Sequence, residues 1–137
     1  MGTAVLYMEA GLCYHTIKQT GARKRLTDWR SVMKKVRITA VRKASYPDLM
    51  EKYENPIQHA CDVDEGQVWT ANGWAKPEGF CDSAWDSISS FVMTLAHGGG
   101  NFYDGWMKNP RSAMISCNDG FRPVSFYLEA LDEEAEA

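Results

Sequence analysis

The sequence lacks several features by which common classes of protein are recognised. No stretch approaches the roughly 18 uninterrupted apolar residues that a membrane-spanning helix needs. It has no H-E-x-x-H motif, no Ser-His-Asp order and no stripe of aromatic and basic residues, and its four cysteines include no C-x-x-C pair. These absences exclude a membrane protein, a disulfide-dense mini-protein and a globally basic nucleic-acid binder. Neither a membrane nor a nucleic acid is therefore expected as a partner.

The sequence does contain enough apolar residues for one folded domain. Its 137 residues are 45% apolar and 24% charged, which is typical of a chain that buries a core. The charge is unevenly distributed, because residues 1–35 carry seven basic and two acidic side chains, whereas the rest carry eight basic and sixteen acidic ones. The net charge of −3 thus combines a basic leader with an acidic domain, whose field disfavours phosphate-rich ligands.

The N-terminal segment is predicted to lie outside the folded domain. It contains the cationic run Arg23–Arg25 in a stretch without helical or strand periodicity. We predict a basic, poorly ordered extension over residues 1–33, a single compact domain over residues 34–131 and an acidic tail over residues 132–137. The extension is either a basic arm that contacts an acidic partner or a segment without function before a natural start at Met33.

The first residues and the cysteines together indicate a compartment. Residues 1–13 have no basic region at their start, and Glu9 interrupts their apolar run, so a secretory signal is not predicted. We therefore expect a cytoplasmic location. In that reducing compartment, cysteines are thiols or metal ligands rather than structural disulfides.

Alternating and helical patterns predict the first three structural elements. Residues 36–40 alternate apolar and polar side chains, which is the pattern of a half-buried strand. Pro47 opens a short helix that ends before Pro56, and the apolar residues of this helix are expected on one side. A second strand is expected within residues 61–71, because the turn dipeptide Asn72-Gly73 follows it.

The remaining predicted elements are one long helix and a hairpin. Apolar residues recur every three or four positions over residues 84–95, and Asp82 or Ser83 is expected as the N-cap. Residues 118–120, Asn-Asp-Gly, are expected to form a three-residue connection between two alternating segments. These elements predict an α+β fold: a small two-layer domain with a mainly antiparallel sheet, two helices (one long) on one face, and a C-terminal β-hairpin.

Three cysteines, Cys61, Cys81 and Cys117, each lie beside a turn or the end of an element. Zinc and iron–sulfur sites are built at such places, because their ligands must converge without crossing a packed core. His59 or Asp119 is a candidate fourth ligand, since each lies two positions from one of these cysteines. The cofactor would then be zinc or an iron–sulfur cluster. The alternatives are a redox or nucleophilic thiol and inert, partly buried thiols.

Cys81 and Arg122 are the candidate catalytic residues. Cys81 directly precedes the long helix, where the helix dipole favours a thiolate, although the neighbouring Asp82 favours the neutral thiol. Arg122 lies in the hairpin turn after Cys117 and could hold a carboxylate or phosphate group. The alternative for Arg122 is an ion pair with Asp119 or Asp82 that fixes the turn.

Trp74 and Trp106 are candidates for a binding surface. Both lie in Gly-flanked, turn-like segments, where large aromatic side chains often line a pocket or an interface. Together with Arg122, they are the predicted residues for binding a partner protein or a small-molecule ligand. The alternative is that the aromatic residues belong to an ordinary small core, as is expected of Trp85 on the helix stripe.

Several short motifs occur together in one order. They are YPDL at residues 46–49, PEGFCD-x-AW at residues 77–85 and C-x-DG-x-RPV at residues 117–124. In this combination the chain resembles a family of short, uncharacterised prokaryotic proteins about as long as residues 34–131. The resemblance implies that Cys61, Cys81 and Cys117 are the positions of interest, and it leaves residues 1–33 outside the shared part. It implies no reaction.

The sequence therefore supports two functional hypotheses from different classes. The first is a small cytoplasmic protein in which three cysteines form a metal or iron–sulfur site linked to redox metabolism. The second is a non-catalytic accessory or interaction module that binds a partner protein or small ligand through an aromatic surface. An enzyme with Cys81 as nucleophile and Arg122 as anion holder is a third alternative. The positions of the three sulfurs in the folded protein separate the first hypothesis from the others.

Overall fold

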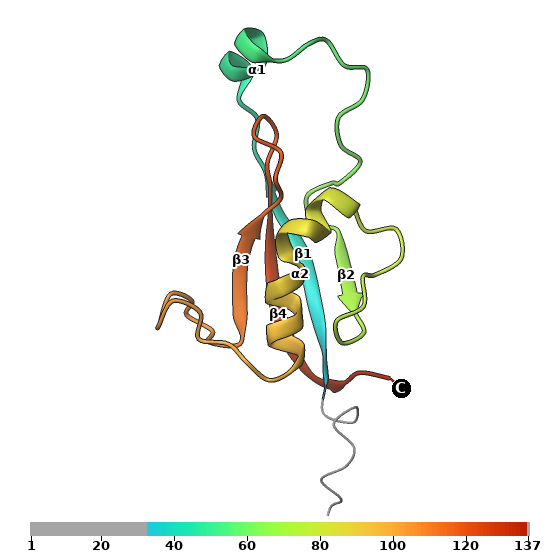
Figure 1. The fold of residues 1–137 in the computed structure, drawn as a ribbon, viewed down its shortest axis with the longest axis vertical. Coiled ribbons are helices and arrows are strands. Elements are labelled where there is room, and N and C mark those ends of the chain that lie inside the picture. Colours follow the sequence, from blue (N-terminus) through green and yellow to red (C-terminus); the bar gives the residue numbers. More distant parts are fainter. Residues whose placement is uncertain (1–32, 137) are drawn as a thin grey trace, which may run out of the picture.

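Four strands and two helices make up the part of the chain that the structure describes (Figure 1). A computed structural model describes residues 33–136. In chain order the elements are β1 (Lys34–Lys43), α1 (Pro47–Tyr53), β2 (Val68–Ala71), α2 (Asp82–Ala96), β3 (Ser112–Ser116) and β4 (Val124–Glu134). The strands form one antiparallel sheet in the order β2-β1-β4-β3, which confirms the predicted α+β fold and its C-terminal hairpin. The predicted N-terminal extension falls almost entirely on residues 1–32, which lie outside the described residues.

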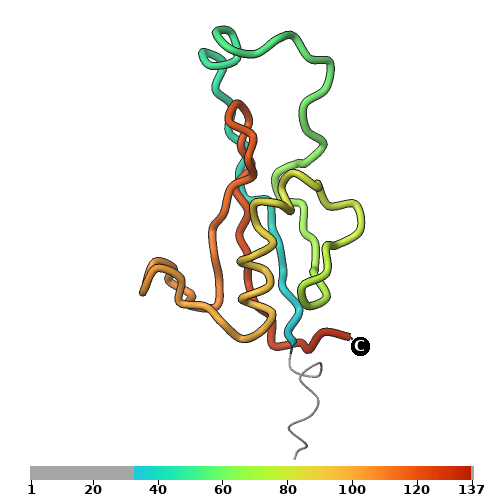
Figure 2. The backbone as a smooth tube through the Cα atoms, in the orientation of Figure 1, coloured from blue at the N-terminus to red at the C-terminus, as the bar shows by residue number. Residues whose placement is uncertain are grey.

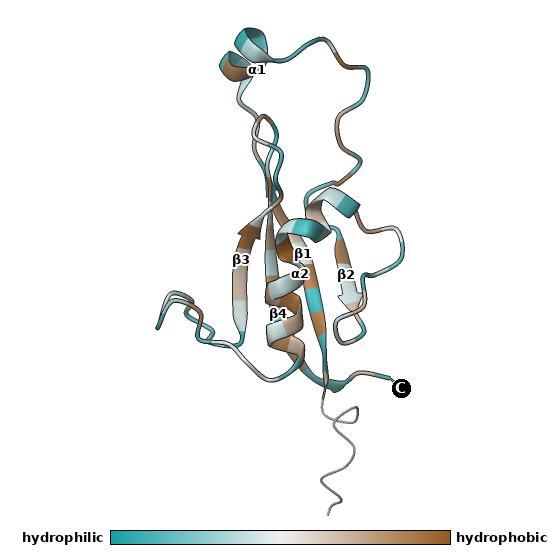
Figure 3. Cartoon of the chain, in the orientation of Figure 1, coloured by the Kyte–Doolittle hydropathy of each residue, from teal (hydrophilic) through white to brown (hydrophobic). Residues whose placement is uncertain are grey.

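The core lies between α2 and the face of the sheet that α2 covers (Figures 1 and 3). In the central strands every second residue is buried, so that Ile38 of β1 and its partner Leu128 of β4 are both fully buried. The helix contributes one continuous apolar stripe, whose buried members are Ala84, Ile88, Val92, Leu95 and Ala96. The apolar residues of the strands, which recur every second position, and those of α2, which recur every 3.6 positions, thus pack into one layer, as predicted.

Residues 44–62, which we call the arm, leave this packed layer beyond one end of the sheet (Figure 2). The arm begins beside the β3–β4 connection, where the N–H of Ala44 donates to the Pro123 carbonyl at 2.9 Å and the N–H of Tyr46 donates to the Phe121 carbonyl at 2.9 Å. It contains α1, yet none of its residues is buried. The expectation that two helices cover one face of the sheet therefore holds only for α2, because these backbone bonds hold the start of α1 at the end of the sheet.

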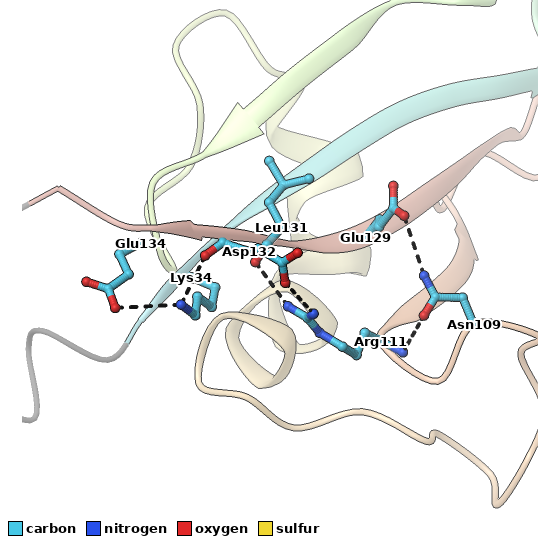
Figure 4. Close-up of polar contacts among 7 residues, drawn as sticks. All are labelled: Lys34, Asn109, Arg111, Glu129, Leu131, Asp132 and Glu134. Atoms are coloured by element: carbon cyan, nitrogen blue, oxygen red, sulfur yellow. Dashed lines mark hydrogen bonds and ion pairs between the residues drawn. The ribbon is translucent and has the colours of Figure 1, made fainter.

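Ion pairs and hydrogen bonds close the opposite end of the sheet (Figure 4). Lys34 donates to the carbonyl of Asp132 at 3.0 Å and lies opposite Glu134 in the strand register. Arg111 pairs with the Asp132 carboxylate at 2.7 Å. Residues 132–134, the first part of the predicted acidic tail, belong to β4, and basic side chains of β1 and beside β3 pair with them.

Candidate functional site

Three cysteines that are far apart in the sequence line one small cavity. Cys61 comes from the arm, Cys81 from the start of α2 and Cys117 from the residue that follows β3. All three are partly buried thiols. The cavity, which we call the inner cavity, has a volume of about 90 Å³, and its polar walls come from the first turn of α2 and the hairpin connection: Ser83, Asn118, Asp119 and Arg122.

Cys81 is the N-cap residue of α2, in place of the predicted Asp82 or Ser83. Its side chain makes no capping hydrogen bond, and the Ser83 hydroxyl instead donates to Asn118 Oδ1 at 2.5 Å. Cys81 therefore stands at the positive end of the helix dipole, although its sulfur does not accept a hydrogen bond from the first N–H groups of α2. The Asp82 carboxylate, which opposes a negative sulfur in the sequence argument, is paired with the ammonium group of Lys76.

Cys117 is held against β4 by backbone hydrogen bonds. Its N–H donates to the Val124 carbonyl at 2.9 Å. In return, the N–H of Val124 donates to the Cys117 sulfur at 3.2 Å. The sulfur is thus an acceptor at a fixed position on the sheet, and its place depends on the pairing of β3 with β4.

The connection from Cys117 to β4 is longer than the predicted three residues. Asp119 Oδ1 accepts hydrogen bonds from the N–H of Phe121 at 2.7 Å and from the N–H of Arg122 at 3.0 Å, so the turn is built around this carboxylate. Pro123 has no N–H with which to continue the ladder. Residues 118–123 therefore form one polar loop over the inner cavity.

Cys61 lies on the returning part of the arm, which Lys43 fastens to β1. The Lys43 ammonium donates to the carbonyl of Cys61 at 3.3 Å and to that of Val63 at 3.0 Å. The backbone N–H of Lys43 donates to Glu65 Oε1 at 2.7 Å. A shift in the register between β1 and β4 precedes Lys43 and places it opposite Val124. Cys61 is consequently attached through its backbone, by a flexible lysine side chain.

Arg122 forms a bidentate ion pair with Glu54, and not the predicted pair with Asp119 or Asp82. The two N···O distances are 2.8 and 2.7 Å, and the side chains of Arg122 and Glu54 are only 20% and 15% exposed. These hydrogen bonds hold the pKa of the Glu54 carboxyl below its ordinary 4.5 and raise the pKa of Arg122. The pair uses one N–H of each terminal nitrogen and balances the charge of the guanidinium group, which weakens the attraction of Arg122 for a further anion.

A second, wider cavity shares Cys61 and Cys81 with the inner one. This outer cavity has a volume of about 430 Å³, and its other polar and aromatic lining residues include His59, Asp62 and Trp69. The imidazole of His59 lies 2.5 Å from Asp62 Oδ1. The two candidate fourth ligands are thereby separated: Asp119 lines the inner cavity with all three cysteines, whereas His59 lines the outer one with two of them.

No preformed metal cluster is present in residues 33–136. Within this range, no group of three or more His, Cys, Asp or Glu side chains is arranged to hold a metal ion. The three sulfurs share a cavity without occupying ligating positions. Cys81 and Cys117 are fixed on α2 and on the hairpin, so Cys61, which lies on the unburied arm, is the ligand whose movement would close such a site.

Trp74 and Trp106 do not form one surface. Trp74 follows β2 and Trp106 precedes β3, and these strands are the two opposite edges of the sheet. Trp106 packs edge-on against Tyr103, with ring centroids 5.3 Å apart, and the Tyr103 side chain is largely exposed. The binding surface predicted from both tryptophans is therefore divided into two separate places.

The residues that shape the site and that the sequence argument missed are Glu54, Lys43 and Trp69. Glu54 and Arg122 are 68 positions apart, so no local pattern connects them. Lys43 stands at the end of a predicted strand and carries no signal for its two carbonyl contacts. Trp69 stands in a predicted strand region, and its place on the outer cavity depends on how the arm returns.

A comparison with protein-family models, with curated proteins and with solved structures gave no match. The resemblance of residues 34–131 to a family of short prokaryotic proteins therefore stays a prediction. Among residues 33–136, no helix combines the length and the apolar character needed to cross a membrane.

Proposed function

We propose that the protein binds a thiophilic metal, zinc or the iron of an iron–sulfur cluster, through Cys61, Cys81 and Cys117, and serves a redox process in a reducing cytoplasm. The observation that carries this proposal is the convergence of three sulfurs from three separate segments on one cavity of about 90 Å³. Thiolates are the ligands that zinc and iron–sulfur clusters prefer, and three protein ligands leave one position for a further group.

Backbone groups with positive partial charge lie near two of the three cysteines. Cys81 lies at the positive end of α2, and the Cys117 sulfur accepts a hydrogen bond from the N–H of Val124. A metal ion needs deprotonated thiols, and such donors stabilise charged acceptors in a partly buried place. Apolar side chains form the rest of the wall, which limits the access of water: Ala60, Val63, Ala84, Val124 and Phe126.

Asp119 is the fourth ligand that the cavity favours over His59. It lines the same cavity as the three cysteines, and only its Oδ1 is used by the turn. Its second oxygen thus remains for a metal. His59 lies at the outer cavity and is paired with Asp62. Binding then requires Cys61, which is partly buried against the core, to move toward the other two sulfurs.

Metal analysis of protein purified without oxygen tests the proposal. The parent carries Cys13→Ser, so that Cys61, Cys81 and Cys117 are its only thiols. We expect about one zinc ion or one cluster per chain. Replacing any one of the three cysteines by serine should lower the affinity by more than about tenfold. Asp119→Asn, which keeps Oδ1 for the turn, should lower it more than His59→Gln does.

The control for these variants is Cys13→Ser alone, which should leave the metal content of the natural sequence unchanged. Reduced protein that takes up neither zinc nor ferrous iron with sulfide would overturn the proposal. The alternative, an accessory module that binds through an aromatic surface, would then rest on the exposed pair of Tyr103 and Trp106.

A further inference from the structure

The outer cavity has the size and the walls of a small-molecule site. Its volume of about 430 Å³ lies within the range of ligand pockets, roughly 300–1,000 Å³. Cys61 and Cys81 stand on its wall together with the half-buried indole of Trp69. Two thiols, an aromatic side chain and a cavity of this size therefore occur in one place. The two thiols also line the inner cavity, whereas Trp69 and this wider space have no part in the metal proposal.

The charge around the outer cavity indicates the kind of ligand. Among the described residues that line it, Asp62 is the one carboxylate, and lysine and arginine are absent. Asp62 Oδ1 lies 2.5 Å from the imidazole of His59, so its second oxygen is the one that faces an incoming cation without this partner. The Asp62 side chain is 89% exposed, so it can meet a ligand that arrives from solvent. A fixed carboxylate attracts cations and repels anions. The cavity consequently favours a small organic molecule that carries a positive group.

We propose that the outer cavity binds a small disulfide bearing an ammonium group, and that Cys81 and Cys61 reduce this disulfide. The thiolate of Cys81 attacks one sulfur of the ligand, a bond forms between Cys81 and that sulfur, and the other half leaves as a thiol after taking up a proton. The thiolate of Cys61 then attacks Cys81 of this mixed disulfide. The second half leaves as a thiol, and a Cys61–Cys81 disulfide remains. One ligand disulfide is reduced to two thiols while two protein thiols are oxidised to one disulfide.

The structural elements that carry the two cysteines indicate which of them attacks first. Cys81 is the N-cap residue of α2, so its backbone has a fixed position on the packed layer. Cys61 lies on the arm, in which no residue of the range 44–62 is buried. It can approach Cys81 after the first step, because its backbone is held by the flexible Lys43 side chain. The fixed cysteine attacks first and the movable one completes the exchange.

This activity goes beyond the proposed metal site and does not require it, and a chain whose Cys61 and Cys81 hold a metal cannot carry it out. It needs Cys61 and Cys81 as free thiols and does not use Cys117, which lines the inner cavity but not the outer one. The test is therefore made in a parent that carries Cys13→Ser and Cys117→Ser, in the presence of a chelator. Failure of metal binding leaves this result untouched, and failure of the exchange leaves the metal result untouched.

The probe is cystamine, a small disulfide with two ammonium groups, added without oxygen at pH 8. Released cysteamine and the mass of the intact protein are followed over time. The parent should release two thiols per chain and lose two hydrogens. Cys61→Ser should stop at the mixed disulfide after one thiol, and Cys81→Ser should react at least about tenfold more slowly. A Cys81→Ser variant that reacts as fast as the parent would overturn the proposal.

The choice of ligand is tested with a disulfide of similar length and opposite charge, 3,3′-dithiodipropionate. The parent should react with cystamine at least about fivefold faster than with this anion. Asp62→Asn should remove most of that preference, whereas Asp104→Asn, which removes an exposed carboxylate from the loop before β3, should keep it. Equal rates with both disulfides in the parent would contradict the assignment of a cationic ligand. Retained helical circular dichroism shows that each variant is folded.

Discussion

Helix α2 and the arm each contain eight apolar residues, but only α2 buries any of them. α2 buries five residues against the sheet, whereas the arm buries none and leaves Leu49, Tyr53 and Ile57 exposed. The 15 residues of α2 provide several turns of one apolar stripe, while the seven of α1 provide two turns beyond the end of the sheet. Apolar residues therefore stabilise this fold only where they can pack against a face of the sheet.

The candidate site lies where α2 and the hairpin meet the arm. Cys81 and Cys117 belong to the packed layer, and Cys61 belongs to the arm. The inner and outer cavities therefore lie where a rigid part of the molecule meets a part with few stabilising contacts. Segments of low local stability are those that move on binding. This arrangement suits a site in which two sulfurs are fixed and one adjusts.

The largest difference is expected when one aromatic side chain is removed from the packed core and one from the arm. Phe126→Ala deletes the largest fully buried side chain, and should lower the free energy of unfolding by about 3–5 kcal/mol, because a cavity remains in a packed core. Tyr53→Ala removes an exposed ring from α1 and should change the free energy of unfolding by less than about 0.5 kcal/mol. Urea unfolding measures both. Similar losses in the two variants would show that the arm is packed like the core.

A smaller effect is expected where the arm is fastened to the hairpin. Glu54→Gln breaks the bidentate pair with Arg122, leaving a largely covered guanidinium without its carboxylate, which is costly. We expect the melting temperature to fall by a few degrees and amide hydrogen exchange to rise over residues 54–62. Glu51→Gln, an exposed change on α1, serves as the control and should alter neither. Unchanged exchange in Glu54→Gln would show that the pair does not hold the arm.

The smallest effect is the pH dependence of that same pair. The pKa of Glu54 in the folded protein lies below 4.5 because of its hydrogen bonds with Arg122. Its contribution to stability is therefore complete above pH 4.5 and is lost as the pH falls through the lower, folded-state pKa. The difference in melting temperature between the natural protein and Glu54→Gln should be constant near neutral pH and shrink in acid. A difference that grows on acidification would contradict this assignment.

Much of the fold follows from local patterns in the sequence. The alternation around Ile38 and the helical stripe around Ile88 predict the two elements that build the core, because burial requires a period of two in a strand and 3.6 in a helix. The continuation of β4 to Glu134 was missed, since it depends on Lys34 and Arg111, which lie far away in the chain. The residue at which such a strand ends is set by its pairing with distant residues, which no local sequence pattern predicts.

The sequence predicts which residues could form the site better than it predicts how they are arranged. The positions of Cys61, Cys81 and Cys117 at the ends of elements identify candidates, because convergence is easiest there. Their common cavity depends on the path of the arm, and that path is set by Lys43 and by the ion pair of Glu54 with Arg122. These contacts join distant residues of ordinary type, so the sequence alone contains no sign of them.

The order of strands in the sheet also has a consequence for how the chain folds. The two central strands, β1 and β4, are the first and last elements described, and Val36 pairs with Ala130. β2 pairs only with β1, and β3 pairs only with β4. Closing such a distant contact costs loop entropy before any packing repays it, which slows folding. A nascent chain that still lacks β4 has only the short β2 to pair with β1, so the central pair of the sheet can form only after β4 has been synthesised.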